Sequence, residues 1–288
     1  MALIPPHFMN SVVAIGNRDD SGVISWVASG FFYGRFREEL NEGNRRYGTF
    51  LVTNKHVLQG LSDPVVRANP VGTEPAREIG LAIQDEAGVP VWVGHPDPEI
   101  DVVVTGVGLD AMRNMGLEVS FFQDEHAATL EKMQELGMSE GDALFLFGFP
   151  MGMVGGPRSA AVVRGGTMAQ LQGAYAGAAK SYIVDGYVFP GNSGGPVVSK
   201  PEMISIDGTA AVGSAFLIGI VSSYVSYQDV AVSTQTGRNR VVFEENSGLS
   251  NVFPIEAIDQ TVDVWDLAHP ESRVSEIAPA SDVPTIDE

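Results

Sequence analysis

The sequence contains no cysteine among its 288 residues. This absence excludes disulfide bonds, catalytic thiolates, zinc sites built on cysteine and iron–sulfur clusters. A chain of this length can bury enough apolar surface to fold without disulfides, and their absence is typical of proteins in a reducing compartment. We therefore expect a cytoplasmic location.

Basic residues are also few: 17 Lys and Arg stand against 36 Asp and Glu, for a net charge of −19. Nucleic acids and anionic membranes bind basic patches, so this balance argues against both as partners. No apolar run approaches the roughly 18 residues that span a bilayer, and the start of the chain, Met1–His7, lacks the basic region of a signal peptide. We expect no membrane partner, and the sequence carries no signature of an oligomeric state.

Histidine occurs only five times. The four histidines other than His56 show no paired spacing of the kind that builds a metal site (His7, His95, His126 and His269). Because cysteine is absent as well, the sequence predicts neither a metal nor another cofactor.

Glycine and proline are abundant, at 33 and 17 residues, and they separate short runs rich in Val, Ile and Phe. Such runs with turn residues between them are typical of all-β proteins built as sandwiches or barrels. The expected strands are 12–15, 31–33, 50–53, 102–107, 143–147, 160–163, 181–184, 197–198, 216–222 and 241–243.

Two segments are expected to be helical. Asp124–Leu136 contains no Gly or Pro and begins with acidic residues, and Ile255–Leu267 has apolar side chains at helical spacing. The charged stretch Arg35–Arg46 is expected to be a surface loop between two strands. After Pro270 the chain becomes acidic, and Glu271–Glu288 is expected to be a flexible tail.

The segment Phe189–Val198 reads FPGNSGGPVV and places Ser193 among glycines. Glycines leave space for a substrate backbone, and they allow successive N–H groups to point into one cavity, as an oxyanion hole requires. A serine alone is a weak nucleophile and needs a base. By itself this motif is equally consistent with a glycine-rich turn.

Two further segments supply the missing groups. The run FLVTNKHVL places His56 where a strand ends and a loop begins, and EIDVVV places Asp101 at the start of an apolar strand. Each residue alone is more often structural. Together the three occur in the order His56, Asp101, Ser193, as a base, an acid and a nucleophile.

In this order and in the contexts TNKHV, DVVV and GNSGGP, the sequence resembles the chymotrypsin-like (trypsin-fold) serine proteases. Within that family it is most similar to the bacterial Htr/Deg-type branch. The usual signal or anchor and the C-terminal PDZ domain of that branch are not visible here. The strand after Asp101 reads Val-Val-Val where the branch usually has a small middle residue.

The resemblance implies two six-stranded antiparallel β-barrels with an active site between them, and a C-terminal helix. Residues 8–115 would form the first barrel, 116–137 the linker with a short helix, 138–256 the second barrel, and 257–288 the C-terminal helix and tail. It also implies a His56, Asp101 and Ser193 triad, an oxyanion hole of the Gly191 and Ser193 N–H groups, and a protein or peptide substrate.

The implied layout also indicates where substrate side chains bind. Tyr187, six residues before the nucleophile, would lie at the base of the first side-chain pocket, and Ser222, Ser223 and Tyr224 would line the facing strand. Ser222 would also support Asp101. An aromatic residue in place of an acid predicts cleavage after small or medium apolar residues. The segment Val225–Gly248 is expected to form a long hairpin beside this pocket.

Three other features bear on function. Asn192 is neutral, so it cannot pair with a new N-terminal ammonium, and trypsin-style activation is not expected. A catalytically silent trypsin-fold binding module remains an alternative. So does an α/β-hydrolase esterase, since GNSGG fits G-x-S-x-G, although Gly194-Gly195-Pro196 is a poor helix start. The natural substrate, and whether the enzyme has one target or many, have no signature in the sequence.

Overall fold

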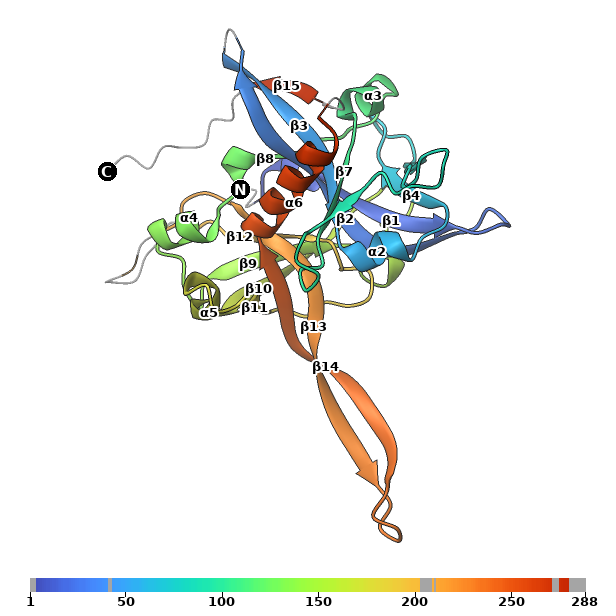
Figure 1. Ribbon diagram of the computed structural model, residues 1–288, viewed down its shortest axis with the longest axis vertical. Helices are drawn as coiled ribbons and strands as arrows, with labels where there is room; N and C mark the ends of the chain where they lie inside the picture. Colours follow the sequence, from blue (N-terminus) through green and yellow to red (C-terminus); the bar gives the residue numbers. More distant parts are fainter. Residues whose placement is uncertain (1–3, 41–42, 203–208, 210, 271–274, 280–288) are drawn as a thin grey trace.

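Short apolar strands alternating with glycine turns build two β-structures that lie side by side in the computed structural model (Figure 1). The structure describes residues 4–40, 43–202, 209, 211–270 and 275–279. The first half is one sheet in the order β5-β4-β1-β2-β3-β7-β6, with β15 paired to β3 and β8 to β2. Its strands are β1 (Val12–Arg18), β2 (Ile24–Glu39), β3 (Asn44–Thr53), β4 (Pro64–Ala68), β5 (Arg77–Gly80), β6 (Val93–Gly94), β7 (Val103–Gly106), β8 (Phe122–Gln123) and β15 (Ser275–Pro279).

The second half is a closed barrel in the order β10-β11-β14-β13-β12-β9. It contains β9 (Ala143–Gly148), β10 (Val162–Gln170), β11 (Tyr182–Asp185), β12 (Pro196–Ser199), β13 (Leu217–Val232) and β14 (Asn239–Pro254). All neighbouring strands in it are antiparallel. The predicted all-β fold and the six-stranded second barrel are therefore confirmed, whereas the first half has more strands than the six expected.

Helical segments are short, with one exception. They are α1 (Pro6–Met9), α2 (Lys55–Gln59), α3 (Leu109–Asn114), η2 (Asp124–His126), α4 (Leu130–Glu135), η3 (Pro150–Gly152), α5 (Gln172–Tyr175) and α6 (Ile255–Ala268). The prediction for Ile255–Leu267 is confirmed by α6 to within one residue. In the described part of the chain, no helix combines the length and apolar character that crossing a bilayer requires.

Three buried clusters hold the molecule together, because alternate strand residues face inward. One lies within the first half and one inside the second barrel. The third joins both halves to α6: it contains Phe31 and Val52 from the first, Phe147 and Leu217 from the second, and Trp265 from the helix. The two halves therefore share one buried apolar cluster, which fixes the position of one half relative to the other.

The predicted helix over Asp124–Leu136 is broken in the structure. Ala127 has extended dihedral angles and pairs with Leu217 of β13, and the Ala128 N–H donates to the Leu217 carbonyl at 2.9 Å. The chain becomes helical again after Thr129, whose hydroxyl caps α4. A backbone bond to the second barrel therefore overrides local helix propensity.

Arg35–Arg46 is not a loop as expected, because β2 extends to Glu39 and β3 begins at Asn44. Its arginines are paired across the molecule: Arg35 with Asp259 and Arg37 with Asp266, both on α6. In the predicted tail, residues 275–279 form β15 against β3. Its other residues, 271–274 and 280–288, lie outside the described part.

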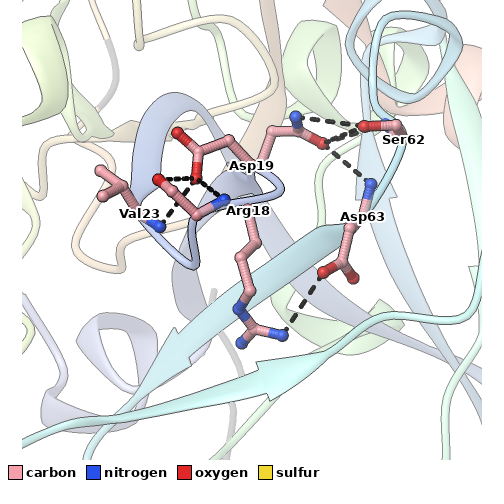
Figure 2. Close-up of polar contacts among 7 residues, drawn as sticks. Arg18, Asp19, Val23, Ser62 and Asp63 are labelled. Carbon is pink, nitrogen blue, oxygen red and sulfur yellow. Dashed lines mark hydrogen bonds and ion pairs between the residues drawn. The ribbon is translucent and has the colours of Figure 1, made fainter.

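The turn between β1 and β2 shows how polar groups define the loops. The Asp19 carboxylate accepts hydrogen bonds from the Ser21 and Val23 N–H groups, both at 2.9 Å (Figure 2). Arg18 reaches Asp63 at 3.4 Å and so ties this turn to the loop before β4 (Figure 2). This exposed pair is worth little energy, and the Asp19 turn does most of the local ordering.

Candidate active site

The positions of His56 and Asp101 follow from strand pairing in the first half. β3 and β7 are antiparallel, with Thr53 opposite Val103. Thr53 ends β3 three residues before His56, and β7 begins two residues after Asp101. The register therefore places the histidine beside the aspartate.

The contact between these two side chains is direct. His56 Nδ1 lies 2.5 Å from Asp101 Oδ2, and the His56 backbone N–H donates to Asp101 Oδ1 at 3.0 Å. Asn54, which is fully buried, donates from Nδ2 to the Asp101 carbonyl at 2.7 Å. The His56 side chain is 55% exposed. Asp101 thus orients the ring, and the ring is open to a ligand.

Ser193 lies in the loop between β11 and β12 of the second half. The Ser29 N–H of β2 donates to the Ser193 carbonyl at 2.9 Å, and the Gly194 N–H donates to the Val221 carbonyl at 3.0 Å. A side chain at Gly194 would collide with Thr53, the last residue of β3. The loop that carries Ser193 therefore packs directly against the end of the strand that leads to His56.

The Ser193 hydroxyl donates to the Ser222 carbonyl at 3.4 Å, near the outer limit of a hydrogen bond. Across the described residues, no hydrogen bond joins this hydroxyl to His56. The structure thus brings His56 and Asp101 into contact and places Ser193 on the adjoining loop of the other half.

Two N–H groups around the serine have no partner among the described residues, those of Gly191 and Ser193. Their neighbours are bonded: the Asn192 N–H to the Phe189 carbonyl and the Gly195 N–H to the Asn192 carbonyl, both at 2.9 Å. Gly191 has φ of 101°, and a side chain there would collide with the Phe149 carbonyl. Glycine is therefore required at the position that supplies one of the two unpaired donors.

The direction of the Gly191 N–H is set by the preceding carbonyl. The Pro190 carbonyl accepts from the Met151 N–H at 2.6 Å. A trans peptide points its C=O and its N–H in opposite directions, so the Gly191 N–H points away from Met151. Met151 is the one described non-glycine residue with a left-handed φ, 54°, and backbone strain of this kind is concentrated at functional sites.

Ser29 holds this loop and was missed by sequence reasoning. Its hydroxyl donates to the Gly191 carbonyl at 2.6 Å and accepts from the Phe149 N–H at 2.9 Å. The side chain is fully buried. The available signal was a serine inside the apolar strand run of β2, since a buried hydroxyl needs partners.

Asn192 supplies a neutral contact to the same loop. It is buried, and its Oδ1 accepts from the Phe189 N–H at 3.0 Å. The loop is therefore held by Ser29, Met151 and Asn192 through uncharged hydrogen bonds.

The predicted substrate-binding residues occupy different settings. Tyr187 is 50% exposed, lies against Gly248 and stacks on Phe189, with ring centroids 6.4 Å apart. Tyr224 is half-buried and donates to Glu244 at 3.3 Å. Tyr187 therefore presents an aromatic surface on the barrel; it is not a buried floor.

The two serines of the facing strand also differ. Ser222 is buried and offers its carbonyl to Ser193, whereas Ser223 is exposed and accepts from Asn251 Nδ2 at 3.2 Å. The expected support of Asp101 by Ser222 is not seen in the described structure. The carboxylate of Asp101 is instead satisfied by two groups of His56.

An ion pair joins the two halves near the acid. Lys180 of the second half contacts Asp97 at 2.6 Å and also Glu99, both in the segment before Asp101. The pair with Lys180 lowers the pKa of Asp97. No group of three or more His, Asp or Glu suited to hold a metal ion occurs among the described residues.

The chain was compared with known proteins. No curated protein matches it. Among solved structures, the crystal structure of the MamO protease domain from Magnetospirillum magneticum (apo form) matches with 16% identity and a TM-score of 0.46, covering 88% of this chain and 96% of that one. The family model described as a trypsin-like peptidase domain matches residues 28–202, more than half of the chain and the whole span from Ser29 to Ser193. The chain therefore belongs to the trypsin-like peptidase domain family.

Proposed function

We propose that this protein is a serine endopeptidase in which Ser193 is the nucleophile, His56 the general base and Asp101 the residue that orients the base. The observation that carries the proposal is the arrangement of the two halves. The first holds His56 Nδ1 at 2.5 Å from Asp101, and the second packs the Ser193 loop against the end of β3. This is the division of roles that acyl transfer through a serine requires.

The proposed reaction proceeds in two stages. Ser193 Oγ attacks the peptide carbonyl while His56 Nε2 takes its proton, and His56 then donates that proton to the leaving amine. Water, deprotonated by His56, attacks the acyl-serine and the proton returns to Ser193 Oγ. Asp101 keeps the proton of His56 on Nδ1 and stabilises the imidazolium that forms in each stage.

The unpaired N–H groups of Gly191 and Ser193 support an oxyanion hole for the same reaction. Both are fixed before substrate arrives, because the Met151 N–H holds the Pro190 carbonyl, which precedes the Gly191 N–H, and the Gly195 N–H holds the Asn192 carbonyl, which precedes the Ser193 N–H. Preorganised donors of this kind stabilise the charge of a tetrahedral intermediate without reorganising during the reaction. Removal of one such donor typically costs about 10²–10³ in kcat.

The Ser193 hydroxyl must turn from the Ser222 carbonyl toward His56 for this chemistry. Its hydrogen bond to Ser222 is long, at 3.4 Å, and rotation of a serine side chain takes only picoseconds to nanoseconds. Catalytic hydrogen bonds are often loose without substrate and tighten in the complex. A catalytically silent binding module of the same fold would have the same Ser193 loop but would not hydrolyse peptides.

The proposed substrate is a protein or peptide with a small or medium apolar residue before the scissile bond. Tyr187 presents an uncharged aromatic surface stacked on Phe189, which suits apolar contacts and offers no ion pair to a lysine or arginine side chain. A preference for Arg or Lys at that position in a peptide library would contradict this part of the proposal.

Labelling with a fluorophosphonate tests the nucleophile. We expect the wild type to be labelled and to cleave a peptide library, and Ser193→Ala to lose both while its melting temperature stays the same. Ser139→Ala serves as the matched control, because Ser139 is exposed in the turn before β9 and lies outside the proposed site. A folded wild-type protein that is neither labelled nor active would establish the silent binding module instead.

A further inference from the structure

β13 and β14 continue far beyond the barrel. They remain paired from Gly219–Pro254 to Val232–Asn239, and Figure 1 shows the distal part projecting from the body as a two-stranded ribbon. We call residues 225–246 the arm. Most of its side chains are exposed to solvent, in contrast to the buried residues 217–222 of the same strand.

Both outer edges of the arm lack a strand partner among the described residues, because β14 pairs with β11 only from Leu249 to Val252. The edge of β13 is the one that leads to the site. β12 pairs with β13 only up to Pro196 opposite Ile220, and within the described structure β13 is then paired on its β14 side alone. From Ser222 to Val232 this free edge contains eleven residues and is about 33 Å long, at about 3.3 Å for each step from one residue to the next. An exposed edge is a template for the addition of another strand.

The free edge begins at the proposed nucleophile. The Val221 N–H donates to the Gly195 carbonyl at 2.9 Å, and the next residue, Ser222, accepts from the Ser193 hydroxyl. A chain bound with its scissile bond at Ser193 and running antiparallel to β13 therefore has its preceding residues beside the arm. The edge of the arm is a direct continuation of the site.

The side chains of the arm are unusual for a solvated hairpin. Large apolar residues are exposed on both strands, and their exposed fractions reach 57% at Tyr227, 52% at Val232 and 54% at Val242. An isolated two-stranded hairpin is marginally stable in water, and contiguous exposed apolar groups mark interaction surfaces. A third strand on the free edge would both pair the backbone and cover part of this surface.

We propose that the arm is an extended docking surface for the polypeptide substrate: the segment that precedes the scissile bond adds to β13 as an antiparallel strand. This rests on the proposed endopeptidase function and extends it to substrate selection. The favoured segment is unfolded, rich in strand-forming residues and carries lysines close to the scissile bond, because Asp229, Glu244 and Glu245 lie on the part of the arm nearer the barrel, whereas Arg238 and Arg240 lie near its tip. Main-chain pairing would supply affinity, and alternate side chains would supply selectivity.

Three peptides that share the same cleavage sequence but differ in the residues that flank it test the proposal. The first is capped three residues before the scissile bond, the second carries eight further Thr, Val and Lys residues on that side, and the third carries the same eight after the scissile bond. We expect kcat/KM for the second to exceed that for the other two by roughly tenfold, equivalent to about 1.4 kcal/mol. N-methylation of alternate residues in the extension should abolish this gain, because it removes the strand hydrogen bonds.

A shortened arm provides the protein-side test. Gln228 and Glu244 are directly opposite, so an Asn-Gly turn can replace residues 229–243 and leave the Tyr224–Glu244 contact in place. This variant should cleave the short peptide at the wild-type rate and lose the advantage of the long one. Arg240→Gln, which keeps the arm and its acidic side chains and lies on β14, should retain that advantage.

The outcomes separate the two proposals. If no peptide is cleaved and no fluorophosphonate is bound, the endopeptidase function fails. If the short peptide is cleaved but the extension or its N-methylation changes nothing, the docking surface is overturned. A dimer that becomes monomeric when the arm is shortened, with the gain for the long peptide unchanged, would show that the arm binds a second copy of the chain instead.

Discussion

At the residue scale, the proposed catalytic geometry depends on groups that carry out no chemistry. Ser29 bonds through its hydroxyl and its N–H to both sides of the loop that contains Gly191 and Ser193. It is a positioning residue, since it does not touch the reacting atoms. Its loss should therefore alter the rate of reaction more than the binding of substrate.

Ser29→Ala is expected to lower kcat by at least tenfold with little change in KM, and to destabilise the fold by about 1–3 kcal/mol, because two buried groups lose a partner. Steady-state kinetics and denaturant unfolding measure the two effects. Ser11→Ala is the matched control: its hydroxyl is equally buried and bonds the His7 carbonyl at 2.7 Å in another part of the molecule. Equal losses of kcat in both variants would show that Ser29 acts only through stability.

At the element scale, α6 joins parts of the chain that are far apart in sequence. It follows the second barrel but packs on the first half, where Tyr33 donates to Asp259 at 2.9 Å and the Trp265 ring lies 5.2 Å from that of Phe50. Trp265 also covers Gly106 of β7, where a side chain would collide with the indole. The helix thus stabilises the sheet that presents His56 and Asp101.

Trp265→Ala should reduce the free energy of unfolding by about 3–5 kcal/mol, the usual cost of removing a large buried aromatic side chain. Leu267→Ala on the same helix is the control, since Leu267 is 83% exposed and should change stability by less than about 0.5 kcal/mol. Urea unfolding of both variants measures the difference. Similar stabilities would mean that α6 is not anchored through its indole.

At the scale of the whole molecule, the stability of the fold depends on pH through two titratable groups in the linker, His126 and Asp124, whose effects have opposite signs. Burial lowers the pKa of His126 to about 4, and His7 and Lys132 nearby add to this effect, which Glu125 counters. Burial raises the pKa of Asp124 to about 7, and Glu125 acts in the same direction. Because of His126, the free energy of unfolding decreases as pH falls from 6.5 to about 4. Because of Asp124, it increases as pH falls from about 7 to 3.8.

Single variants separate these contributions. Relative to wild type, His126→Gln should become more stable on going from pH 7 to pH 4.5, by on the order of 3 kcal/mol, and Asp124→Asn should become less stable. Each variant lacks one of two opposing dependences, so the differences have opposite signs. Urea unfolding at both pH values provides the measurement, and parallel pH profiles for the three proteins would contradict the assignment.

Several features of this protein could be predicted from its sequence alone. The order of His56, Asp101 and Ser193, the glycines around the serine and the neutral Asn192 are local patterns, and they indicated a serine protease of this fold. The helix Ile255–Ala268 and most of the strands were also visible, because their apolar spacing is set by neighbouring residues. These local patterns predict strands and helices without information about contacts between distant parts of the chain.

Other features were decided only by the tertiary structure. The helix predicted over Asp124–Leu136 breaks because Ala128 bonds β13, and the charged stretch after Tyr33 is strand because its arginines meet α6. Ser29 and Met151 act on a loop more than 30 residues from either of them in sequence. These contacts are made between segments that only folding brings together, so no local pattern of residues encodes them.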